Sequence, residues 1–264
     1  MYCNWGILGP GFIATRAIIP AIQEVSNSRL LAVASSNEER SREIALRFGI
    51  ERFYSDYQAL LDDPDIDVVY IALPNHLHRE WTIRAAVAKK HVLCEKPLSM
   101  YAAECNEMIT ACQQANVLLM EAVMYRFHPR MIYLKQMLVA RELGDLRFLH
   151  AAFSFNFNAP GNYRAIKQFG GGALLDVGSY CVNAARWLIG YEPASSQVAT
   201  SYNQQSIDVN TSAILRFSED VFAHIQSSFV AAEHQVIEVV GTTGAATAPL
   251  AFTAWRDDTT ILLI

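Results

Sequence analysis

A glycine-rich turn between an apolar strand and an apolar helix is the feature that most constrains the fold of this chain. Residues 5–8 predict a short buried strand, and the pattern Gly-x-Gly-x-x-Ala follows, from Gly9 through Gly11 to Ala14. Gly9 permits a tight turn, Gly11 lets the backbone approach a pyrophosphate, and Ala14 lets the helix pack close to the strand. The free N–H groups of the first helical turn favour an anion. We expect a dinucleotide site here; the alternative is an ordinary glycine turn.

The composition limits which partners the chain can have. The 264 residues are 52% hydrophobic and 18% charged, as in a globular chain with one large or two modest domains. A net charge of −5 without a Lys/Arg cluster argues against nucleic acid and anionic membranes as partners. No run reaches the roughly 18 apolar residues of a membrane span, and no signal peptide opens the chain. The five cysteines form no C-x-x-C pair, so we expect buried thiols, a reducing cytoplasm and no metal site.

Strands and helices alternate in the first half of the sequence, as they do in a doubly wound parallel sheet. We expect strands over 30–34, 67–73, 91–94 and 117–120, and helices over 38–48, 53–61, 78–89 and 101–115. Residues 1–122 are therefore predicted to form a Rossmann-type dinucleotide-binding domain in an α/β fold. Ligands of such sheets bind beyond the carboxyl ends of the strands, where Gly9, Ser36, Asn75, His76 and Lys96 are expected.

The segment after the second strand bears on which dinucleotide is bound. An NAD site places Asp or Glu about 20 residues beyond the fingerprint, where the carboxylate binds the ribose 2′-hydroxyl. This sequence has Ser36 and Asn37 there, with Arg40 and Arg42 close behind. Hydroxyl, amide and guanidinium donors suit a 2′-phosphate. We expect NADP, with NAD possible; the alternative is a helix cap followed by two solvated arginines.

The sequence pattern changes near residue 123. Residues 147–157 alternate between polar and apolar, which predicts a strand with one apolar face, and residues 173–189 predict a helix after three glycines. Further strands are expected over 197–202, 211–217, 221–229 and 235–240. We expect residues 123–264 to form an α+β domain on a largely antiparallel sheet, which serves substrate binding and dimerisation. An open face of such a sheet would suit pairing into a homodimer.

Two residue groups have the character of a reaction centre. Asp176 and Tyr180 are four residues apart on the predicted helix, so both lie on one face, which Asn183 shares. Gly178 between them allows a close approach of backbone or substrate. The alternative is a helix-capping aspartate and a core tyrosine with a satisfied hydroxyl. Lys96 ends a strand, although a lone lysine is more often a solvated one.

Four motifs in this order resemble those of the glucose-fructose oxidoreductase/inositol dehydrogenase (Gfo/Idh/MocA) family. They are Gly9-x-Gly11-x-x-Ala14, Pro74-Asn75-x-x-His78, Glu95-Lys96-Pro97 and Asp176-x-Gly178-x-Tyr180. Residues 120–129 and 170–178 are similar to the branch that holds D-xylose dehydrogenase and dimeric dihydrodiol dehydrogenase. That branch has tyrosine where inositol dehydrogenases have histidine, and it usually uses NADP. Many of its members have an arginine against the 2′-phosphate where this chain has Ser36.

The resemblance implies hydride transfer between C4 of a nicotinamide and a carbinol carbon of a sugar or cyclic diol. Tyr180 would exchange the proton, Lys96 would lower the phenol pKa across the nicotinamide, and Asp176 would orient Lys96 or a second substrate hydroxyl. No metal is required. The implied cofactor contacts are Gly9, Gly11, Phe12, Ile13, Ser35, Ser36, Asn37, Arg40, Leu73, Asn75, His76, His78, Glu95 and Lys96. The implied substrate contacts are Arg126, Tyr163, Arg164 and Asn183.

Members of the family usually continue some tens of residues past the last similar segment, residues 238–244. The second domain is therefore expected to be C-terminally short, which would affect stability and activity. Two other functions stay open. An NAD-linked inositol-type dehydrogenase is disfavoured by the missing ribose carboxylate and by Tyr180. A non-catalytic nucleotide-binding sensor is disfavoured by the presence of Lys96, Asp176 and Tyr180.

Overall fold

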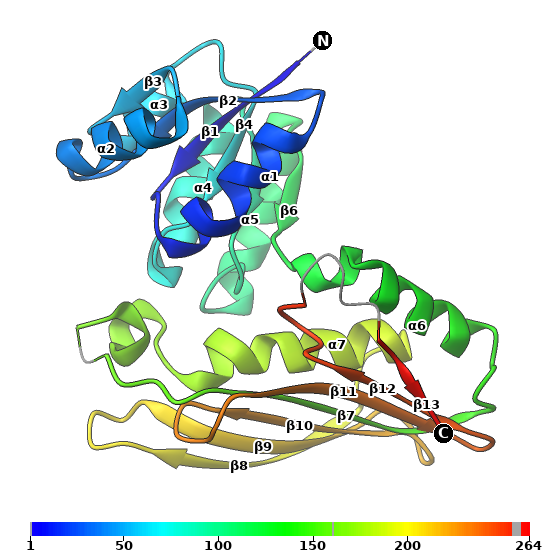
Figure 1. Ribbon diagram of the computed structural model, residues 1–264. Coiled ribbons are helices and arrows are strands. Elements are labelled where there is room, and N and C mark those ends of the chain that lie inside the picture. Colours follow the sequence, from blue (N-terminus) through cyan, green and yellow to red (C-terminus); the bar gives the residue numbers. More distant parts are fainter. Residues whose placement is uncertain (1, 160, 255–259) are drawn as a thin grey trace. The chain divides into compact units, whose positions relative to one another are not determined.

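A computed structural model describes residues 2–159, 161–254 and 260–264. The chain divides into two compact units, Met1–Ala122 and Val123–Ile264 (Figure 1). The first unit is a helix-covered parallel sheet and the second is a mostly antiparallel sheet with helices, so the predicted α/β fold class is confirmed. In the part of the chain that is described, no helix is long and apolar enough to cross a membrane.

The first unit contains a six-stranded sheet in the order β3-β2-β1-β4-β5-β6, and every pair in it is parallel. Its strands are β1 (Cys3–Leu8), β2 (Ser28–Ala34), β3 (Arg52–Tyr54), β4 (Val68–Ile71), β5 (His91–Cys94) and β6 (Leu119–Glu121). Its helical segments are η1 (Ala14–Ile18), α1 (Ile19–Glu24), α2 (Glu38–Phe48), α3 (Tyr57–Leu61), η2 (Asn75–Leu77), α4 (His78–Val87) and α5 (Ala102–Ala115). The strand order reverses between β1 and β4, which is where such sheets bind ligands.

Alternating side chains of the strands pack into separate cores on the two faces of this sheet. Ile7 belongs to a cluster with side chains of η1, α1 and α2, whereas Leu8 belongs to a cluster with side chains of α3, α4 and α5. Both residues are fully buried. A strand that is buried on both faces has no polar alternation, which explains the unbroken apolar runs in the sequence. The packed strands thereby hold the ends of the connecting loops in fixed positions.

The predicted helix over 53–61 is partly wrong, because its first residues form a strand. Residues Arg52–Tyr54 form β3, which pairs with β2 through Phe53 and Val33, and α3 begins only at Tyr57. The side chain of Asp56 caps this helix by accepting a hydrogen bond from the N–H of Ala59 at 2.9 Å. A three-residue edge strand carries too little periodic pattern to be separated from a helix that follows it so closely.

The second unit contains a seven-stranded sheet in the order β13-β12-β11-β7-β10-β9-β8. All of its pairs are antiparallel except β7 with β10. Its strands are β7 (Leu146–Ser154), β8 (Ser195–Tyr202), β9 (Asp208–Arg216), β10 (Phe222–Ser228), β11 (His234–Gly241), β12 (Ala245–Pro249) and β13 (Leu262–Leu263). Its helical segments are η3 (Met124–Phe127), α6 (Pro129–Val139), η4 (Tyr163–Ala165), η5 (Lys167–Phe169), η6 (Leu174–Gly178) and α7 (Ser179–Ile189).

Helix α7 lies along one face of this sheet, and none of the described helices of this unit covers the opposite face (Figure 1). The alternation along β7 explains the difference. Leu149, Ala151 and Phe153 are buried in the core beneath α7, whereas Phe148 and His150 point to the other face. The period-two pattern seen in the sequence is therefore confirmed. The sequence did not predict β12 and β13, which extend the sheet beyond β11.

Both helices that follow a functional glycine turn begin with five residues of π-helix, where continuous α-helix was expected. In the first unit, η1 ends next to α1, whose second residue is Pro20. Proline has no N–H for the i→i−4 ladder, and a π-bulge is one way in which a helix absorbs that loss. In the second unit, η6 contains Asp176, so the acidic residue lies on a wider helical turn than the tyrosine that follows.

Candidate functional site

The two glycines of the first turn have different surroundings. Gly9 has a φ of +82°, and a Cβ there would lie 2.9 Å from the carbonyl oxygen of Ala72 and 2.7 Å from a side-chain carbon of Leu73. Its N–H donates to the carbonyl of Ala34 at 3.0 Å, which ties the turn to β2. A Cβ on Gly11 would meet nothing within 4 Å. The fold therefore requires Gly9, whereas Gly11 keeps space open on the surface of the turn.

The helix after this turn offers unused backbone donors to a ligand. Its first backbone hydrogen bond to the turn is Thr15 N–H to the carbonyl of Gly11, at 3.1 Å. The N–H groups of Phe12, Ile13 and Ala14 precede that bond, so the helix itself cannot satisfy them. The side chains of Phe12 and Ile13 are exposed. Open space at Gly11 and a row of donors beside it match the shape and charge of a pyrophosphate.

The end of β2 combines a helix cap with a guanidinium. The Asn37 Oδ1 accepts a hydrogen bond from the N–H of Arg40 at 3.0 Å and so caps α2. The Arg40 side chain donates to the carbonyl of Pro10 at 3.3 Å and pairs with Glu43. Ser35 is buried, and Ser36 is exposed beside it. A positive charge thus lies between the ribose position and the glycine turn, while the Asn37 oxygen is already used by the helix.

The loops that follow β4 and β5 are joined by the buried imidazole of His78. Its Nδ1 lies 2.9 Å from the carbonyl oxygen of Pro97 and its Nε2 lies 2.8 Å from that of Leu73. Burial lowers the pKa of His78, and the nearby charge of Lys96 lowers it further, although both carbonyls favour the charged ring. The ring is fully buried. His78 therefore positions the loops that carry Leu73 and Lys96, rather than contacting a cofactor itself.

The segment that carries Lys96 is fixed by carboxylates on both sides. The Tyr70 hydroxyl donates to Glu95 Oε1 at 2.5 Å, and the N–H of Lys96 donates to Glu95 Oε2 at 3.2 Å. Two residues later, the N–H of Leu98 donates to Glu121 Oε1 at 2.8 Å. These bonds hold the backbone of Lys96 at the carboxyl end of β5. Glu95 thus supports the loop, which is a role that its motif did not reveal.

Asn75 and His76 are in η2, directly after β4. Asn75 is buried and His76 is partly buried. The first unit therefore brings together, at one edge of its sheet, the glycine turn, the end of β2 and the loops after β4 and β5. These are the four loops that sequence analysis predicted to converge. Their donors fit a dinucleotide with an anionic centre.

In the second unit, the carboxylate of Asp176 is paired with an arginine. Arg164 Nε lies 2.7 Å from Asp176 Oδ2, and Asp176 is only 5% exposed. Burial alone would lower the pKa of Arg164, but the charge of Asp176, then the charge of Tyr163, the hydrogen bond to Asp176 and the charge of Tyr180 raise it. Sequence analysis expected Arg164 to contact substrate and Asp176 to orient Lys96 or a second substrate hydroxyl. It did not predict that the two residues hold each other.

Tyr180 lies one helical turn beyond Asp176 in a mostly aromatic setting. Its ring is 5.6 Å from that of Phe153 and 5.5 Å from that of Phe252, measured between centroids. Its hydroxyl donates to the sulfur of Met124 at 3.5 Å. The residue is 7% exposed. A phenol whose ring is packed this tightly has little freedom to turn, which is what a positioned proton donor requires.

The remaining predicted residues of this unit lie around the same helix. The Tyr125 hydroxyl donates to Asn183 Oδ1 at 2.6 Å, and the Tyr125 ring lies 6.1 Å from that of Tyr180. Arg126 stacks on Trp187, with its guanidinium carbon 5.1 Å from a ring centroid. Sequence analysis did not predict Tyr125 as a site residue, because its partner Asn183 is 58 residues away.

Neither half suggests a metal. Within the described residues, no group of three or more His, Cys, Asp and Glu side chains is placed to hold a metal ion. The first unit does fit a dinucleotide, because Gly11 leaves room for a ligand beside unpaired helical N–H groups. When bound there, NADP would contact the turn of Gly9 and Gly11 with its pyrophosphate, and the guanidinium of Arg40, which donates to the carbonyl of Pro10 in that turn, could hold its 2′-phosphate.

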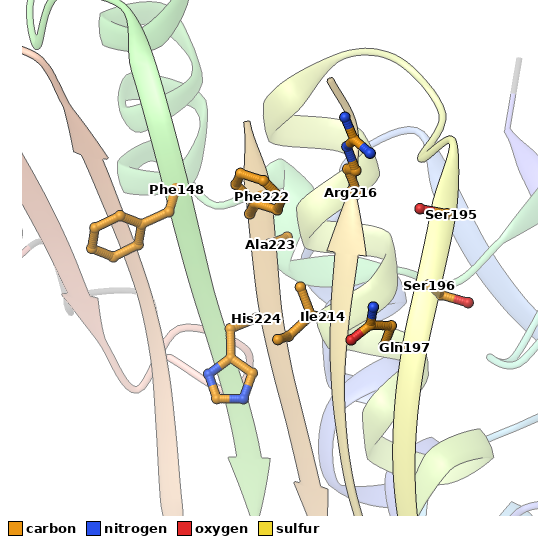
Figure 2. Close-up of a pocket in the computed structure, with 9 residues that line it drawn as sticks. All are labelled: Phe148, Ser195, Ser196, Gln197, Ile214, Arg216, Phe222, Ala223 and His224. Carbon is orange, nitrogen blue, oxygen red and sulfur yellow. The ribbon is translucent and has the colours of Figure 1, made fainter. Parts of the chain in front are cut away.

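A separate hollow of ≈ 640 Å³ lies on the uncovered face of the second sheet (Figure 2). It spans β7, β10, β9 and β8. Its lining residues are Phe148, Ser195, Ser196, Gln197, Ile214, Arg216, Phe222, Ala223 and His224. None of them was predicted as a site residue. The hollow is mostly apolar and contains no carboxylate, so it lacks the groups that proton transfer at a carbinol would use.

Two family descriptions match the chain along most of its length. Residues 3–123 match the oxidoreductase family with an NAD-binding Rossmann fold, and residues 131–247 match the GFO/IDH/MocA C-terminal domain. The chain belongs to the Gfo/Idh/MocA family. The resemblance inferred from the four motifs is therefore confirmed. As a member of this family, the protein is an NAD(P)-dependent oxidoreductase.

Individual relatives agree with this assignment. The chain is 39% identical over 249 residues to D-xylose 1-dehydrogenase (NADP(+)) 2 of Haloferax volcanii, covering 94% of this chain and 76% of that protein. It is 32% identical over 252 residues to trans-1,2-dihydrobenzene-1,2-diol dehydrogenase of Xenopus tropicalis, covering 92% and 74%. The structure of aldose-aldose oxidoreductase from Caulobacter crescentus, complexed with glycerol, matches with a TM-score of 0.92 and 31% identity, covering 100% of this chain and 80% of that one. The predicted branch and the expectation of NADP, with NAD possible, are thus confirmed.

Proposed function

We propose that this protein transfers hydride between NADP and a carbinol carbon of a sugar or cyclic diol, and that Tyr180 exchanges the hydroxyl proton. The observation that carries the proposal is a buried phenol one helical turn from a buried carboxylate that is paired with a partly buried arginine, in a family that binds a nicotinamide cofactor. The named relatives act on xylose and on a dihydrodiol, which supports this substrate class. A polyol or sugar is therefore the small-molecule partner.

The reaction in the oxidative direction moves one proton and one hydride. The ionised oxygen of Tyr180 takes the proton of the substrate hydroxyl, the carbon–oxygen double bond forms, and the carbinol carbon loses its hydride. A bound NADP⁺, held at the turn of Gly9 and Gly11, would supply the hydride acceptor, C4 of its nicotinamide. In reduction Tyr180 returns the proton to the carbonyl oxygen. The protein supplies position and charge for these steps.

A phenol with an ordinary pKa near 10 is a weak base at neutral pH, so the reaction needs positive charge at Tyr180. We assign the Lys96 ammonium to the substrate oxygen during the reaction, where it would favour the phenolate. Asp176 and Arg164 would act from the helix side. Asn183 uses its carbonyl oxygen for Tyr125 and still has two amide N–H donors for a substrate hydroxyl. Arg126 and Tyr163 complete the proposed substrate contacts.

Substitution of Tyr180 by Phe tests the proton transfer directly. It removes only the hydroxyl, and the packing of the ring against Phe153 and Phe252 stays. We expect kcat to fall by about 10²–10⁴-fold while the Kd of NADPH stays nearly unchanged. Steady-state kinetics and NADPH fluorescence titration measure the two effects. Unchanged turnover in Tyr180→Phe would remove this residue from the mechanism.

The substrate and the cofactor are tested together in one screen. Aldoses, inositols and dihydrodiols would each be offered with NADP⁺ and with NAD⁺, and formation of reduced cofactor would be recorded. We expect turnover of an aldose or dihydrodiol with NADP⁺, and tighter binding of NADPH than of NADH. Turnover of an inositol with NAD⁺ would support an inositol-type dehydrogenase. Cofactor binding without turnover of any compound would support a nucleotide sensor instead.

The same proposal includes a second copy of the chain as a partner and a reducing cytoplasm as its location. All five cysteines are free, as expected where thiols stay reduced. The uncovered face of the second sheet presents Phe148 and Phe222 side by side across β7 and β10, with Ile214 on the adjacent β9 (Figure 2). Exposed apolar patches of this kind are typical of contacts between proteins. We assign this face to a homodimer contact.

A further inference from the structure

Arg164 is held in place by its backbone as well as by its charge. Its N–H donates to Asn162 Oδ1 at 3.0 Å, and its carbonyl accepts a hydrogen bond from the N–H of Gly172 at 3.0 Å. Its guanidinium carbon lies 4.8 Å from the ring centroid of Tyr163. A flexible surface arginine that formed an ion pair by chance would lack these backbone restraints. The segment around Arg164 is therefore built to present the guanidinium to Asp176.

The glycines before the helix make this arrangement possible. A Cβ on Gly171 would lie 2.5 Å from the carbonyl oxygen of Arg164, so only glycine lets the two backbones come so close. Gly172 has a φ of +124°, and a Cβ there would overlap the carboxylate of Asp208. Asp208 Oδ2 in turn accepts a hydrogen bond from the N–H of Leu174 at 2.6 Å. The turn thus packs the Arg164 segment directly against the start of the helix that carries Asp176.

Several segments of the second unit contribute ionisable groups near Tyr180. Segment η4 supplies Tyr163 and Arg164, segment η6 supplies Asp176, and segment η3 supplies Tyr125. Strand β7 and the segment after β12 face the phenol with the apolar rings of Phe153 and Phe252. Arg164 is the positive charge in this set, and Asp176 is a negative charge that opposes ionisation of a phenol.

Arg164 and Tyr180 interact electrostatically as well as through Asp176. Two larger effects act on the pKa of Arg164: burial lowers it, and the charge of Asp176 raises it. The ionised form of Tyr180 also raises it, to a smaller extent. Coulomb interactions are reciprocal, so the same charge pair favours the phenolate. Without Arg164, the charge of the buried Asp176 carboxylate would not be balanced by this guanidinium, and that carboxylate would disfavour ionisation of the phenol.

We propose that Arg164 is a positioning residue of this site: it fixes the carboxylate of Asp176, cancels its charge and places a permanent positive charge beside Tyr180. The inference rests on the proposed function, in which Tyr180 exchanges the proton. It assigns the second unit its own means of preparing the phenol, in addition to the ammonium of Lys96. It also gives Asp176 a definite partner, which keeps that carboxylate from suppressing the phenolate.

The test is a titration of Tyr180 in the whole protein without cofactor. Tyrosines labelled with ¹³C at Cζ would be followed by NMR from pH 7 to 12, with the Tyr180 signal assigned through Tyr180→Phe. Arg164→Gln is expected to raise the pKa of Tyr180 by about 1 unit or more, and Asp176→Asn is expected to lower it. Arg164→Gln/Asp176→Asn should bring it back toward the wild-type value. A purely structural ion pair would not give shifts of opposite sign.

Arg186→Gln is the matched control, because Arg186 lies on α7, the helix that carries Tyr180, and pairs with Glu192 at 2.6 Å on the exposed surface. It should leave the titration of Tyr180 unchanged. If Arg164→Gln fails to fold, Arg164→Lys and Asp176→Asn carry the test. The lysine keeps the charge without the planar fork, so a smaller rise is expected. An unchanged Tyr180 pKa in folded Arg164→Gln, or in both Arg164→Lys and Asp176→Asn, would overturn the proposal.

Kinetics separate this inference from the proposed function. In Arg164→Gln the pH at which kcat rises should move upward with the phenol pKa, and KM should change less than kcat. If the wild-type protein turns over none of the screened substrates, the proposed function fails. The titration in the protein without cofactor can still succeed in that case, because it needs no turnover.

Discussion

The two glycines of the first turn have different roles: the fold requires Gly9, whereas Gly11 leaves space for a ligand. Gly9 has left-handed backbone and a crowded Cβ position, whereas Gly11 has open space. Gly9→Ala should lower the free energy of unfolding by about 1–3 kcal/mol, because alanine is strained at this φ and would contact the carbonyl of Ala72. Gly11→Ala should change it by less than about 0.5 kcal/mol. Urea unfolding measures both.

Binding should show the reverse contrast. A methyl group on Gly11 would occupy space that a pyrophosphate needs, so Gly11→Ala should weaken NADPH binding by about tenfold or more, equivalent to roughly 1.4 kcal/mol. Fluorescence titration of the folded variant measures this. Wild-type affinity in Gly11→Ala would show that the open space is not where the phosphates bind. A loss of stability equal to that of Gly9→Ala would show that the space is needed by the fold itself.

At the residue level the sequence predicted which helix carries Asp176 and Tyr180, but it did not predict the partner of Asp176. The fingerprint glycines have the backbone that their motif requires, and Tyr180 and Asp176 are both buried on one helix. The partner of Asp176 could not be predicted, because Arg164 reaches it through an irregular segment and a glycine turn without hydrophobic periodicity. A motif indicates which residue types a function uses. An ion pair between two loops depends on the course of the backbone in both loops, which no local sequence pattern predicts.

Among the secondary-structure elements, His78 connects the ends of two neighbouring strands and makes stability depend on pH. Its pKa is lowered by burial in the folded state, whereas the unfolded value is about 6.5. The unfolded chain therefore binds more protons below that pH, and the free energy of unfolding should decrease as pH falls from about 6.5. One such proton contributes a slope of up to about 1.4 kcal/mol per pH unit. Burial lowers the pKa of His224 as well, so it adds to the same trend.

Substitution of His78 by Gln should reduce this slope between pH 5 and 6.5, whatever it does to the absolute stability. Chemical unfolding at several pH values measures the slope. His234→Gln is the control, because that histidine is exposed at the start of β11 and should leave the slope unchanged. The same slope in His78→Gln as in the wild type would show that this ring does not contribute to the pH dependence.

The elements differ in how far their sequences determine them. Helix α2 spans the predicted residues 38–48, where a side-chain cap begins it and a left-handed glycine ends it. Strand β5 likewise spans the predicted residues 91–94. Strand β3 was missed because three edge residues gain their structure from pairing with β2 and not from their own pattern. The π-helical turns were also missed, because they keep the spacing of apolar residues close to that of an α-helix.

The scale of the whole molecule adds the question of self-association. The uncovered sheet face carries Phe148 and Phe222, which are 44% and 39% exposed and opposite each other in the register of β7 and β10. Next to them, the rings of His150 and His224 stack with centroids 5.3 Å apart. A face with aromatic and imidazole rings and few charges loses little on being desolvated. This is the surface that the proposed homodimer contact would bury.

A charge introduced into this face should therefore separate the copies. Phe222→Lys would place an ammonium in the hollow beside Phe148. In a symmetric dimer each copy would contribute one ammonium, and burying two positive charges at the contact would be unfavourable. Light scattering after gel filtration should give about 59 kDa for the wild type, twice the chain mass of 29.4 kDa, and about 29 kDa for Phe222→Lys. Leu46→Lys is the control, because that leucine is also apolar and exposed but lies on α2 of the other unit, and the variant should stay dimeric. A dimeric Phe222→Lys would place the contact elsewhere, and a monomeric wild type would show that this face is not a dimer contact.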